Sequence, residues 1–297
     1  MKHLRVVNTR LSTLGTLSAL GFLSILGVLN VSAAAEPQRI VSTAGSLTEI
    51  IYALDLQEML VGVDTTSQWP LDATSLPQVG YQRALSAEGI LALAPTIVAA
   101  TAEAGPSEVL QQLTGAGVRL ETFPRDYTLG GLYHRIEQIG EWFEREDEAG
   151  QLVAEIGHDF ATAQALVVQD RKPSVVFLLG TEAGSAMAAG SMTSAHAMIE
   201  YSGGVNALST YDGYKPVNAE ALIEAAPEFL IVVAHGTDNE GHIAESAASL
   251  PGVNLTPAGI KGRIIVVDAL RFLGFGPRSA EAMLDLVEIL HPVPVAQ

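Results

Sequence analysis

The sequence has no cysteine among its 297 residues. This absence excludes a disulfide scaffold, a catalytic thiol, and zinc or iron–sulfur sites built on thiolate ligands. Basic residues are also scarce, because 16 Lys and Arg stand against 33 Asp and Glu and the net charge is −17. Such a balance excludes a nucleic-acid-binding protein, which needs Lys and Arg to neutralise phosphates. The 48% of hydrophobic residues excludes intrinsic disorder and indicates a globular protein.

Several catalytic motifs are missing as well. The sequence has no G-x-S-x-G nucleophile elbow, no P-loop and no H-E-x-x-H pair. The glycine-rich segment at 274–277 lacks the third glycine of a dinucleotide-binding fingerprint. We therefore predict that the protein is not an enzyme. An exported α/β hydrolase is the alternative from a different class, and an esterase assay would test it.

The first 35 residues have the pattern of a secretory signal peptide. Basic residues at the start precede an apolar stretch at 11–31 and three alanines at 33–35. We expect cleavage after Ala35, which leaves 13 basic and 33 acidic residues and a charge of about −20. An uncleaved membrane anchor is the alternative, because the apolar stretch is long. Without a cysteine at the cleavage site there is no lipid anchor, so we predict a soluble periplasmic protein.

The exported part alternates between short apolar strands and helices. We expect strands at 39–42, 60–64, 96–100, 119–123, 174–179, 229–234 and 263–267. We expect helices near 47–56, 88–93, 108–113, 194–201, 219–226 and 279–290. This alternation predicts an α/β fold with mostly parallel sheets that are covered on both faces.

A long helical pattern divides the two series of strands. Apolar residues recur at helical spacing after residue 129, and a second such stretch stops before Pro173. A helix over about 147–170 would be about 35 Å long, which suits a connection between two lobes. The predicted fold is therefore two Rossmann-like lobes joined by a single long α-helix, with the ligand cleft between the lobes. The predicted parts are a signal peptide at 1–35, an N-terminal lobe at 36–146, the connecting helix at 147–171 and a C-terminal lobe at 172–297.

An internal repeat supports duplicated lobes. The segment 87–95 is matched by 219–227, and in each a glutamate lies seven residues before a proline that a strand follows. Upstream, Gly80-Tyr81 is matched by Gly213-Tyr214, offset by one residue. Parallel sheets bind ligands beyond the carboxyl ends of their strands. We therefore expect segments such as 102–106 and 235–241 to line the cleft.

The Gly80-Tyr81-Gln82-Arg83 segment is the strongest candidate for ligand chemistry. A phenolate is a hard anionic ligand that suits ferric iron. A free phenol has a pKa near 10, so a neighbouring guanidinium that stabilises the anion would favour ligation. A loop tyrosine that only packs its ring is the alternative.

Two histidines, His235 and His242, lie in a polar segment after an expected strand. Their spacing is a weak metal signal, because a metal-ion carrier needs three or four converging ligands. Such a carrier remains an alternative that metal analysis would test.

The residues of the exported part resemble the periplasmic haem-binding proteins of bacterial haem ABC importers, a class of substrate-binding proteins with two lobes joined by one long helix. The resemblance covers nearly all of the chain after the signal peptide. It is carried by Arg39-Ile40-Val41-Ser42, Leu47-Thr48-Glu49-Ile50, Val61-Gly62-Val63-Asp64-Thr65-Thr66-Ser67, the segment 76–93, Gly213-Tyr214-Lys215-Pro216 and Leu273-Gly274-Phe275-Gly276-Pro277-Arg278.

The resemblance implies that the protein captures haem and delivers it to an ABC transporter of the inner membrane. Tyr81 matches the tyrosine that ligates haem iron in the family, and Arg83 matches a neighbouring base that supports it. Tyr214 and Arg278 are implied as further haem contacts. The same fold carrying cobalamin or a ferric siderophore is the alternative. We expect a monomer, and an outer-membrane haem receptor system is a further candidate partner.

Two acidic residues, Glu88 and Glu220, match the glutamates with which relatives dock onto arginines of the permease. A two-fold permease needs one acidic contact from each lobe, which would explain the internal repeat. The alternative is that both are ordinary solvated residues at helix starts.

One position departs from the family pattern. Relatives often have an arginine that holds haem in the loop after the strand expected at 229–234, and this chain has His235 there. His235 is therefore a candidate propionate partner, a candidate second iron ligand, or a solvent-facing side chain.

Overall fold

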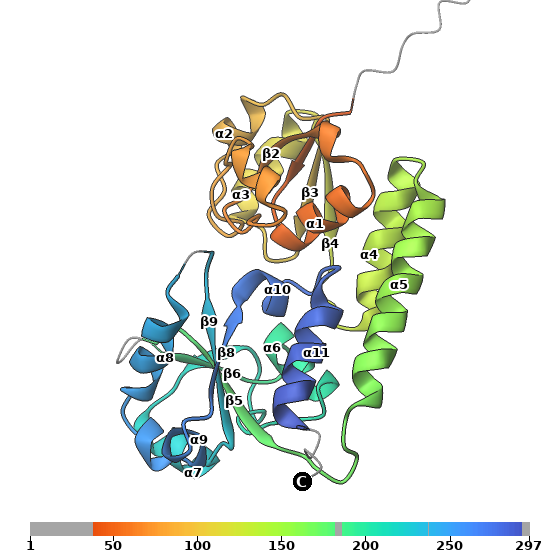
Figure 1. Cartoon of the computed structure of the whole chain (residues 1–297). Helices are drawn as coiled ribbons and strands as arrows, with labels where there is room; N and C mark the ends of the chain where they lie inside the picture. The colour runs from red at the N-terminus through yellow and green to blue at the C-terminus, as the bar shows by residue number, and fades with distance from the viewer. Residues whose placement is uncertain (1–37, 182–185, 237, 293–297) are drawn as a thin grey trace, which may run out of the picture. The chain divides into compact units, whose positions relative to one another are not determined.

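The computed structural model describes residues 38–181, 186–236 and 238–292 (Figure 1). The predicted signal peptide at 1–35 lies outside the described residues. By its internal contacts the stretch 37–297 forms one compact unit. Within the described ranges, we find no helix long and apolar enough to cross a membrane.

The first sheet lies in the N-terminal half of the chain. Among the described residues it has four parallel strands in the order β2-β1-β3-β4. Their bounds are β1 Ile40–Ser42, β2 Leu60–Val63, β3 Ile97–Thr101 and β4 Arg119–Phe123. The connecting elements are α1 Gly45–Ala53, η1 Gln57–Met59, η2 Leu71–Ser75, α2 Ala87–Leu91 and α3 Ser107–Gly115. The expected strands are therefore present, each within one residue of its predicted ends.

The second sheet follows the same plan with one antiparallel margin. Its described strands run in the order β10-β9-β5-β6-β8, and β7 pairs with β5. The pairs β10/β9, β9/β5 and β5/β7 are parallel, whereas β5/β6 and β6/β8 are antiparallel. The strands are β5 Ser174–Leu179, β6 Met187–Ala189, β7 Val205–Asn206, β8 Tyr214–Pro216, β9 Phe229–Ala234 and β10 Ile264–Asp268. The helices are α6 Ser194–Tyr201, α7 Ala219–Ala225, α8 Glu240–Ala248, η3 Val253–Leu255, α9 Pro257–Ile260, α10 Ala269–Leu273 and α11 Ser279–Leu290. The α/β class with mostly parallel sheets is confirmed.

The central strands of both sheets, β1, β3, β5 and β9, are buried on both faces, as expected of parallel sheets. In β5, Val175 and Phe177 belong to one hydrophobic cluster, whereas Val176 and Leu178 belong to another on the opposite face. The cluster that contains Phe177 also contains Ile40 of β1 and the inward face of the helices between the two sheets. The two lobes therefore share one continuous apolar core, which limits how freely they can move apart.

The long helix between the sheets is α5, Glu146–Ala165, and it packs beside α4, Leu129–Trp142, and against α11 (Figure 1). Acidic residues in its first turn suit the positive end of the helix dipole. The helix ends at Ala165 and not near residue 170 as predicted, because Val167 leaves the helix to pack in the C-terminal core. At 20 residues it is about 30 Å long. The lobe boundaries given above stay predictions.

The sequence repeat is also a structural repeat. The segment 87–95 forms α2 and leads into β3, and the segment 219–227 forms α7 and leads into β9. Each helix has a polar N-cap side chain that accepts a backbone N–H, and each repeat has a left-handed alanine, Ala94 or Ala226, just before its proline. Glu88 and Glu220 occupy the first turns of these two helices and are exposed.

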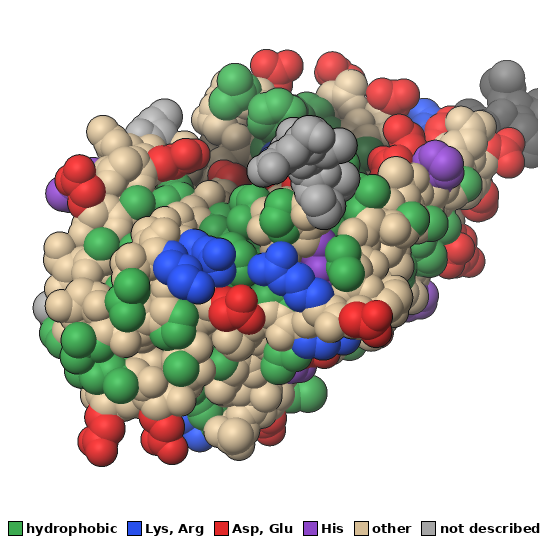
Figure 2. All heavy atoms as spheres, turned by 60° about the horizontal axis from the view of Figure 1, so that its bottom comes forward, with side chains coloured by type: hydrophobic (Ala, Val, Ile, Leu, Met, Phe, Trp, Pro, Cys, Tyr) green, Lys and Arg blue, Asp and Glu red, His purple; other side chains and the backbone are tan. Residues whose placement is uncertain are grey.

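The acidic surplus lies on the surface. On the face that Figure 2 turns toward the viewer, acidic side chains are spread widely whereas Lys and Arg side chains gather near the middle. Among the described residues the buried acids are Glu49 and Asp64. Asp64 accepts hydrogen bonds from Thr66 and Ser67 inside its own turn, whereas Glu49 pairs with Arg278 far along the chain.

Candidate binding site

A cavity of about 780 Å³ lies where the strands of both sheets end. This volume is within the range of small-molecule and cofactor sites. The first lobe contributes residues that follow β1, β2, β3 and β4, and the second contributes Leu179 at the end of β5 and residues that follow β6, β9 and β10. The predicted lining segments at 102–106 and 235–241 supply Glu103, His235 and Gly236. The placement is the one expected at the carboxyl ends of parallel strands.

Tyr81 and Arg83 line this cavity from a tightly held turn of the first lobe. The turn begins at Gly80, whose φ of +94° is readily adopted only by glycine. The Ala84 N–H donates to the Tyr81 carbonyl over 2.7 Å and closes the turn. Gln82 anchors it to the β3–α3 loop, because its carbonyl accepts from the Gly105 N–H over 2.9 Å. The backbone is therefore fixed while the Tyr81 side chain stays 44% exposed.

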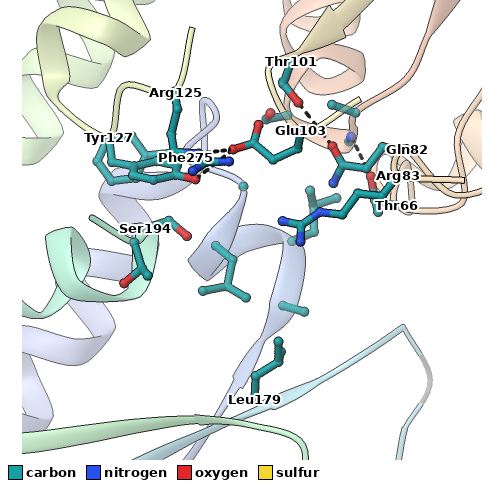
Figure 3. A pocket seen from close by; sticks show the side chains of 18 of the residues that line it. Thr66, Gln82, Arg83, Thr101, Glu103, Arg125, Tyr127, Leu179, Ser194 and Phe275 are labelled. Atoms are coloured by element: carbon teal, nitrogen blue, oxygen red, sulfur yellow. Dashed lines mark hydrogen bonds and ion pairs between the residues drawn. The ribbon is translucent and has the colours of Figure 1, made fainter. Parts of the chain in front are cut away.

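Arg83 extends from the first lobe toward the middle of the cavity (Figure 3). Among the described residues, no hydrogen bond or ion pair holds its guanidinium group. A cation in this state is available to an anionic group of a ligand.

Tyr214 lines the same cavity from the second lobe. It follows Gly213, whose φ is +75°, so both Gly-Tyr segments of the repeat place a tyrosine after a left-handed glycine. Burial raises the pKa of the Tyr214 phenol, and a hydrogen bond with Ser194 and the charge of Arg83 offset part of that rise. The phenol of Tyr214 therefore stays protonated at neutral pH.

His235 lines the cavity directly after β9 and is exposed. Its backbone N–H donates to Asp238 Oδ2 over 2.8 Å, which fixes the start of the loop. In the part of the chain that the structure describes, no three His, Asp or Glu side chains gather as a metal-binding group around His235 and His242 or elsewhere.

Arg278 is not among the residues that line the cavity. Its Nε and Nη2 donate to Glu49 Oε1 over 3.1 and 2.5 Å, and its guanidinium lies 4.9 Å from the ring centre of Trp69. These contacts join the start of α11 to α1 of the other lobe. The structure therefore places Arg278 in an interlobe ion pair, whereas the four other predicted contacts line the cavity.

A charged cluster on the first-lobe wall was missed by the sequence analysis. Glu103 accepts from Arg125 Nε over 2.7 Å and from the Tyr127 hydroxyl over 3.3 Å (Figure 3). Burial alone would raise the pKa of Glu103, but hydrogen bonds from Arg125 and Thr101 and the charge of Arg125 bring it below the ordinary value. Burial and the charge of Glu103 raise the pKa of Tyr127 to about 12.

The cluster leaves both Nη atoms of Arg125 without a described partner, while its Nε is held by Glu103. Its residues follow β3 and β4 directly, so the strand ends of the predicted sheet were the signal that could have found them.

Arg135 of α4 lies at the back of the cavity and is buried. Its Nη1 donates to the Asp126 carbonyl over 3.0 Å and its Nη2 to the Phe275 carbonyl over 2.7 Å. Asp126 belongs to the first lobe and Phe275 to the second. Arg135 is therefore a second polar bridge between the lobes.

The cavity walls differ in character. The first-lobe wall is largely polar, with Thr66, Gln82, Thr101 and the charged groups described above. The second-lobe wall carries the apolar side chains Leu179, Met187, Met192, Leu270, Leu273 and Phe275. Such a cavity suits a ligand with a large apolar surface and a few anionic groups.

Comparison with known proteins gives a family match over most of the chain. The sequence model of a family described as periplasmic binding protein matches residues 40–270. The chain is similar to the periplasmic heme-binding protein RhuT from Roseiflexus sp. RS-1 in its apo form, with 35% identity, a TM-score of 0.80, and coverage of 86% of this chain and 98% of that chain. It is also similar to the periplasmic heme-binding protein BhuT in complex with two hemes, with 36% identity, a TM-score of 0.79 and the same coverage of both chains.

Two curated relatives have lower sequence identity than these two solved structures, and their names give other functions. The chain is 26% identical over 267 residues to an uncharacterized ABC transporter substrate-binding lipoprotein, YvrC, from Bacillus subtilis, covering 89% of this chain and 83% of the relative. It is 27% identical over 217 residues to a vitamin B12-binding protein from Vibrio campbellii, covering 73% of this chain and 78% of the relative. The matches thus agree on a binding protein and differ in the ligand of the relative.

Proposed function

The chain belongs to the periplasmic binding protein family, and from this premise we propose that it captures one haem between its lobes and delivers it to an ABC transporter of the inner membrane. As a member of this family the chain is a solute-binding protein and not an enzyme. Solved relatives named as heme-binding proteins support the choice of haem. Export with cleavage after Ala35 is part of the same proposal.

The observation that carries the proposal is the turn at Tyr81. It presents a half-exposed phenol to a cavity of suitable volume, with the Arg83 guanidinium two residues away on the same wall. In the proposed complex the Tyr81 phenolate would ligate the ferric iron, and Arg83 lines the same cavity two residues along the chain. The apolar second-lobe wall would lie against the macrocycle.

Two cationic groups on the first-lobe wall support haem over cobalamin. Haem carries two propionate groups, whereas the side chains of the corrin ring are neutral amides. Arg83 and the free Nη atoms of Arg125 are two cationic groups on one wall. We propose that they contact the propionates, which would supply from the first lobe a guanidinium contact in place of the arginine that this chain lacks after β9.

A titration with hemin and with hemin dimethyl ester tests this assignment. We expect the free acid to bind at least about tenfold more tightly, because each hydrogen bond between charged groups contributes about 1.5–3 kcal/mol. Arg125→Gln should reduce that preference. Arg119→Gln is the matched control, since Arg119 also donates from Nε to a glutamate but lies outside the cavity. Equal affinity for the acid and the ester would contradict the propionate contacts.

Cobalamin is the second candidate cargo, and the vitamin B12-binding relative is the observation in its favour. A cobalamin site would need neither a phenolate nor free guanidinium groups. If the protein binds cobalamin saturably and does not bind hemin, cobalamin and not haem is the cargo.

We further propose that Glu88 and Glu220 dock the protein onto the permease. The structural repeat supports this role, because each residue lies exposed in the first turn of an equivalent helix of its lobe. The double variant Glu88→Arg/Glu220→Arg should bind hemin as the wild type does and should no longer stimulate ATP hydrolysis by the cognate transporter in proteoliposomes. Glu224→Arg, also exposed and one turn along α7, is the control. Full stimulation by the double variant would remove the docking assignment.

A further inference from the structure

The backbone of Met192 has a left-handed conformation that no stabilising contact of its own side chain explains. In the described part of the chain, the non-glycine residues with positive φ are Asp55, Ala94, Glu144, Met192, Ala226 and Phe275. A non-glycine residue with positive φ costs free energy, so it is found where other interactions of the fold stabilise that conformation.

The other five positions have local explanations. Asp55 and Glu144 directly follow the C-caps of α1 and α4, where a left-handed residue commonly ends a helix. Ala94 and Ala226 precede prolines, which disfavour the right-handed helical conformation in the residue before them. Phe275 is fully buried, with its ring centre 5.9 Å from that of Tyr127.

Met192 neither ends a helix, nor precedes a proline, nor packs in the core. It lies between β6 and α6 with φ of +58°, and 66% of its side chain is exposed. It is the most exposed of the large hydrophobic side chains that line the cavity in the described residues. Neither a helix end nor core packing therefore accounts for its backbone conformation.

Hydrogen bonds on both sides of Met192 prevent the backbone from relaxing. The Ser191 N–H donates to the Tyr211 carbonyl over 2.7 Å, and the Ser191 carbonyl accepts from the Gly213 N–H over 2.8 Å. On the other side, Thr193 Oγ1 donates to the Gly190 carbonyl over 2.8 Å and caps α6. The loop is thus fixed to the segment that carries Tyr214, and the strain at Met192 is imposed by its neighbours.

The Met192 side chain has the chemistry of a ligand contact. A thioether chain is flexible and polarisable, and sulfur makes favourable contacts with aromatic systems. It extends the apolar second-lobe wall that Leu179 and Met187 begin, facing a cavity whose other wall carries Tyr81.

We propose that Met192 is a cargo-contacting residue, held in a left-handed conformation so that its side chain rests on the apolar surface of the bound macrocycle from the second lobe. This inference rests on the proposed haem-binding function. The strained backbone of Met192 then holds an apolar side chain at the cavity in the cargo-free protein, in the position where the macrocycle would bind.

Three substitutions at this position test the inference with hemin as the probe. Met192→Ala and Met192→Gly should raise the hemin dissociation constant by about tenfold through faster dissociation, because a desolvated apolar contact is lost. Met192→Leu keeps a side chain of similar volume and should stay within about threefold of the wild type. Met192→Gly should also raise the unfolding midpoint of the cargo-free protein, since glycine adopts positive φ without strain.

The control is Glu144→Gly, which relieves a left-handed residue away from the cavity. It should raise the unfolding midpoint and leave the hemin affinity unchanged. If the wild type binds hemin and the Ala and Gly variants bind it equally tightly, the role of Met192 is overturned and the proposed function stands. If the wild type itself does not bind hemin, the proposed function fails and this inference fails with it.

Discussion

Tyr81→Phe should abolish the tyrosinate-type ferric absorption spectrum of the hemin complex and weaken hemin binding by about a hundredfold, equivalent to about 2.8 kcal/mol. The substitution keeps the aromatic ring and removes only the hydroxyl oxygen, so it separates ligation from packing. Gly80 and the hydrogen bonds of Gln82 should hold the turn in place in the variant. An absorption spectrum and a hemin titration measure both effects.

Tyr214→Phe is the matched control for this experiment. Tyr214 lines the same cavity after an equivalent glycine, but burial raises the pKa of its phenol and keeps it protonated. We therefore expect this variant to keep the ferric spectrum. A Tyr81→Phe complex with the wild-type spectrum would refute the assignment of Tyr81 as the iron ligand. If only Tyr214→Phe loses the spectrum, Tyr214 of the second lobe is the ligand instead.

Arg278→Met should lower the free energy of unfolding by about 3 kcal/mol at pH 7, because it leaves a buried carboxylate without its partner. The Glu49 side chain is 4% exposed, so water cannot replace the guanidinium. Glu49→Gln should have a smaller effect of about 1 kcal/mol, since a neutral amide still accepts a hydrogen bond and the Arg278 side chain keeps 19% exposure. Urea unfolding of the three proteins measures the difference.

The effect of Arg278→Met should depend on pH with a defined sign. Burial raises the pKa of Glu49 above its ordinary value of 4.5 even though the hydrogen bonds and charge of Arg278 oppose the rise. Without Arg278 the pKa in the folded protein rises further. The pH-dependent part of the destabilisation is then complete above that raised pKa. It is lost as the pH falls through the pKa of Glu49 in the folded wild type, because the carboxyl group is then protonated in both folded proteins.

Arg119→Met is the control for burial. Arg119 also pairs with a glutamate and lies 5.1 Å from the ring centre of Trp142, but its side chain is 51% exposed. An exposed pair of this kind contributes about 1 kcal/mol or less. Equal losses for the two arginine variants, or a loss for Arg278→Met that does not change with pH, would contradict the account of the Glu49 pair.

The Glu49 pair and the Arg135 bridge both join the lobes beside the cavity. Together with the shared apolar core they favour small hinge movements over wide opening. If Glu88 and Glu220 dock onto the permease as proposed, release of cargo would then follow from a limited displacement of the lobes.

The sequence predicted the central strands well because β1, β3, β5 and β9 are apolar runs that are almost entirely buried. It missed β6, β7 and β8. The strand β7 has two residues, whereas β6 and β8 have three residues each and are antiparallel, and β8 ends at a proline that suits only the margin of a sheet. Runs this short carry no periodic signal, so only their pairing in the fold defines them.

The sequence also predicted some residues of the candidate site and missed others, because only some of them stand in distinctive local sequence. Tyr81, Arg83 and Tyr214 stand in glycine-marked turns whose sequence is distinctive, and the structure brings them to one cavity with His235. Arg278 could not be placed, because its carboxylate partner is 229 positions away in the chain. The Arg125 cluster depends on two loops that only the sheet order places side by side.

The most direct test of the central claim is a competition between the two candidate cargoes. The purified protein is mixed with equimolar hemin and cobalamin and passed through a gel-filtration column, and the absorption spectrum of the protein fraction is recorded. The account predicts hemin in that fraction with a tyrosinate-type ferric spectrum that Tyr81→Phe abolishes. A protein fraction that carries cobalamin and no hemin would contradict it.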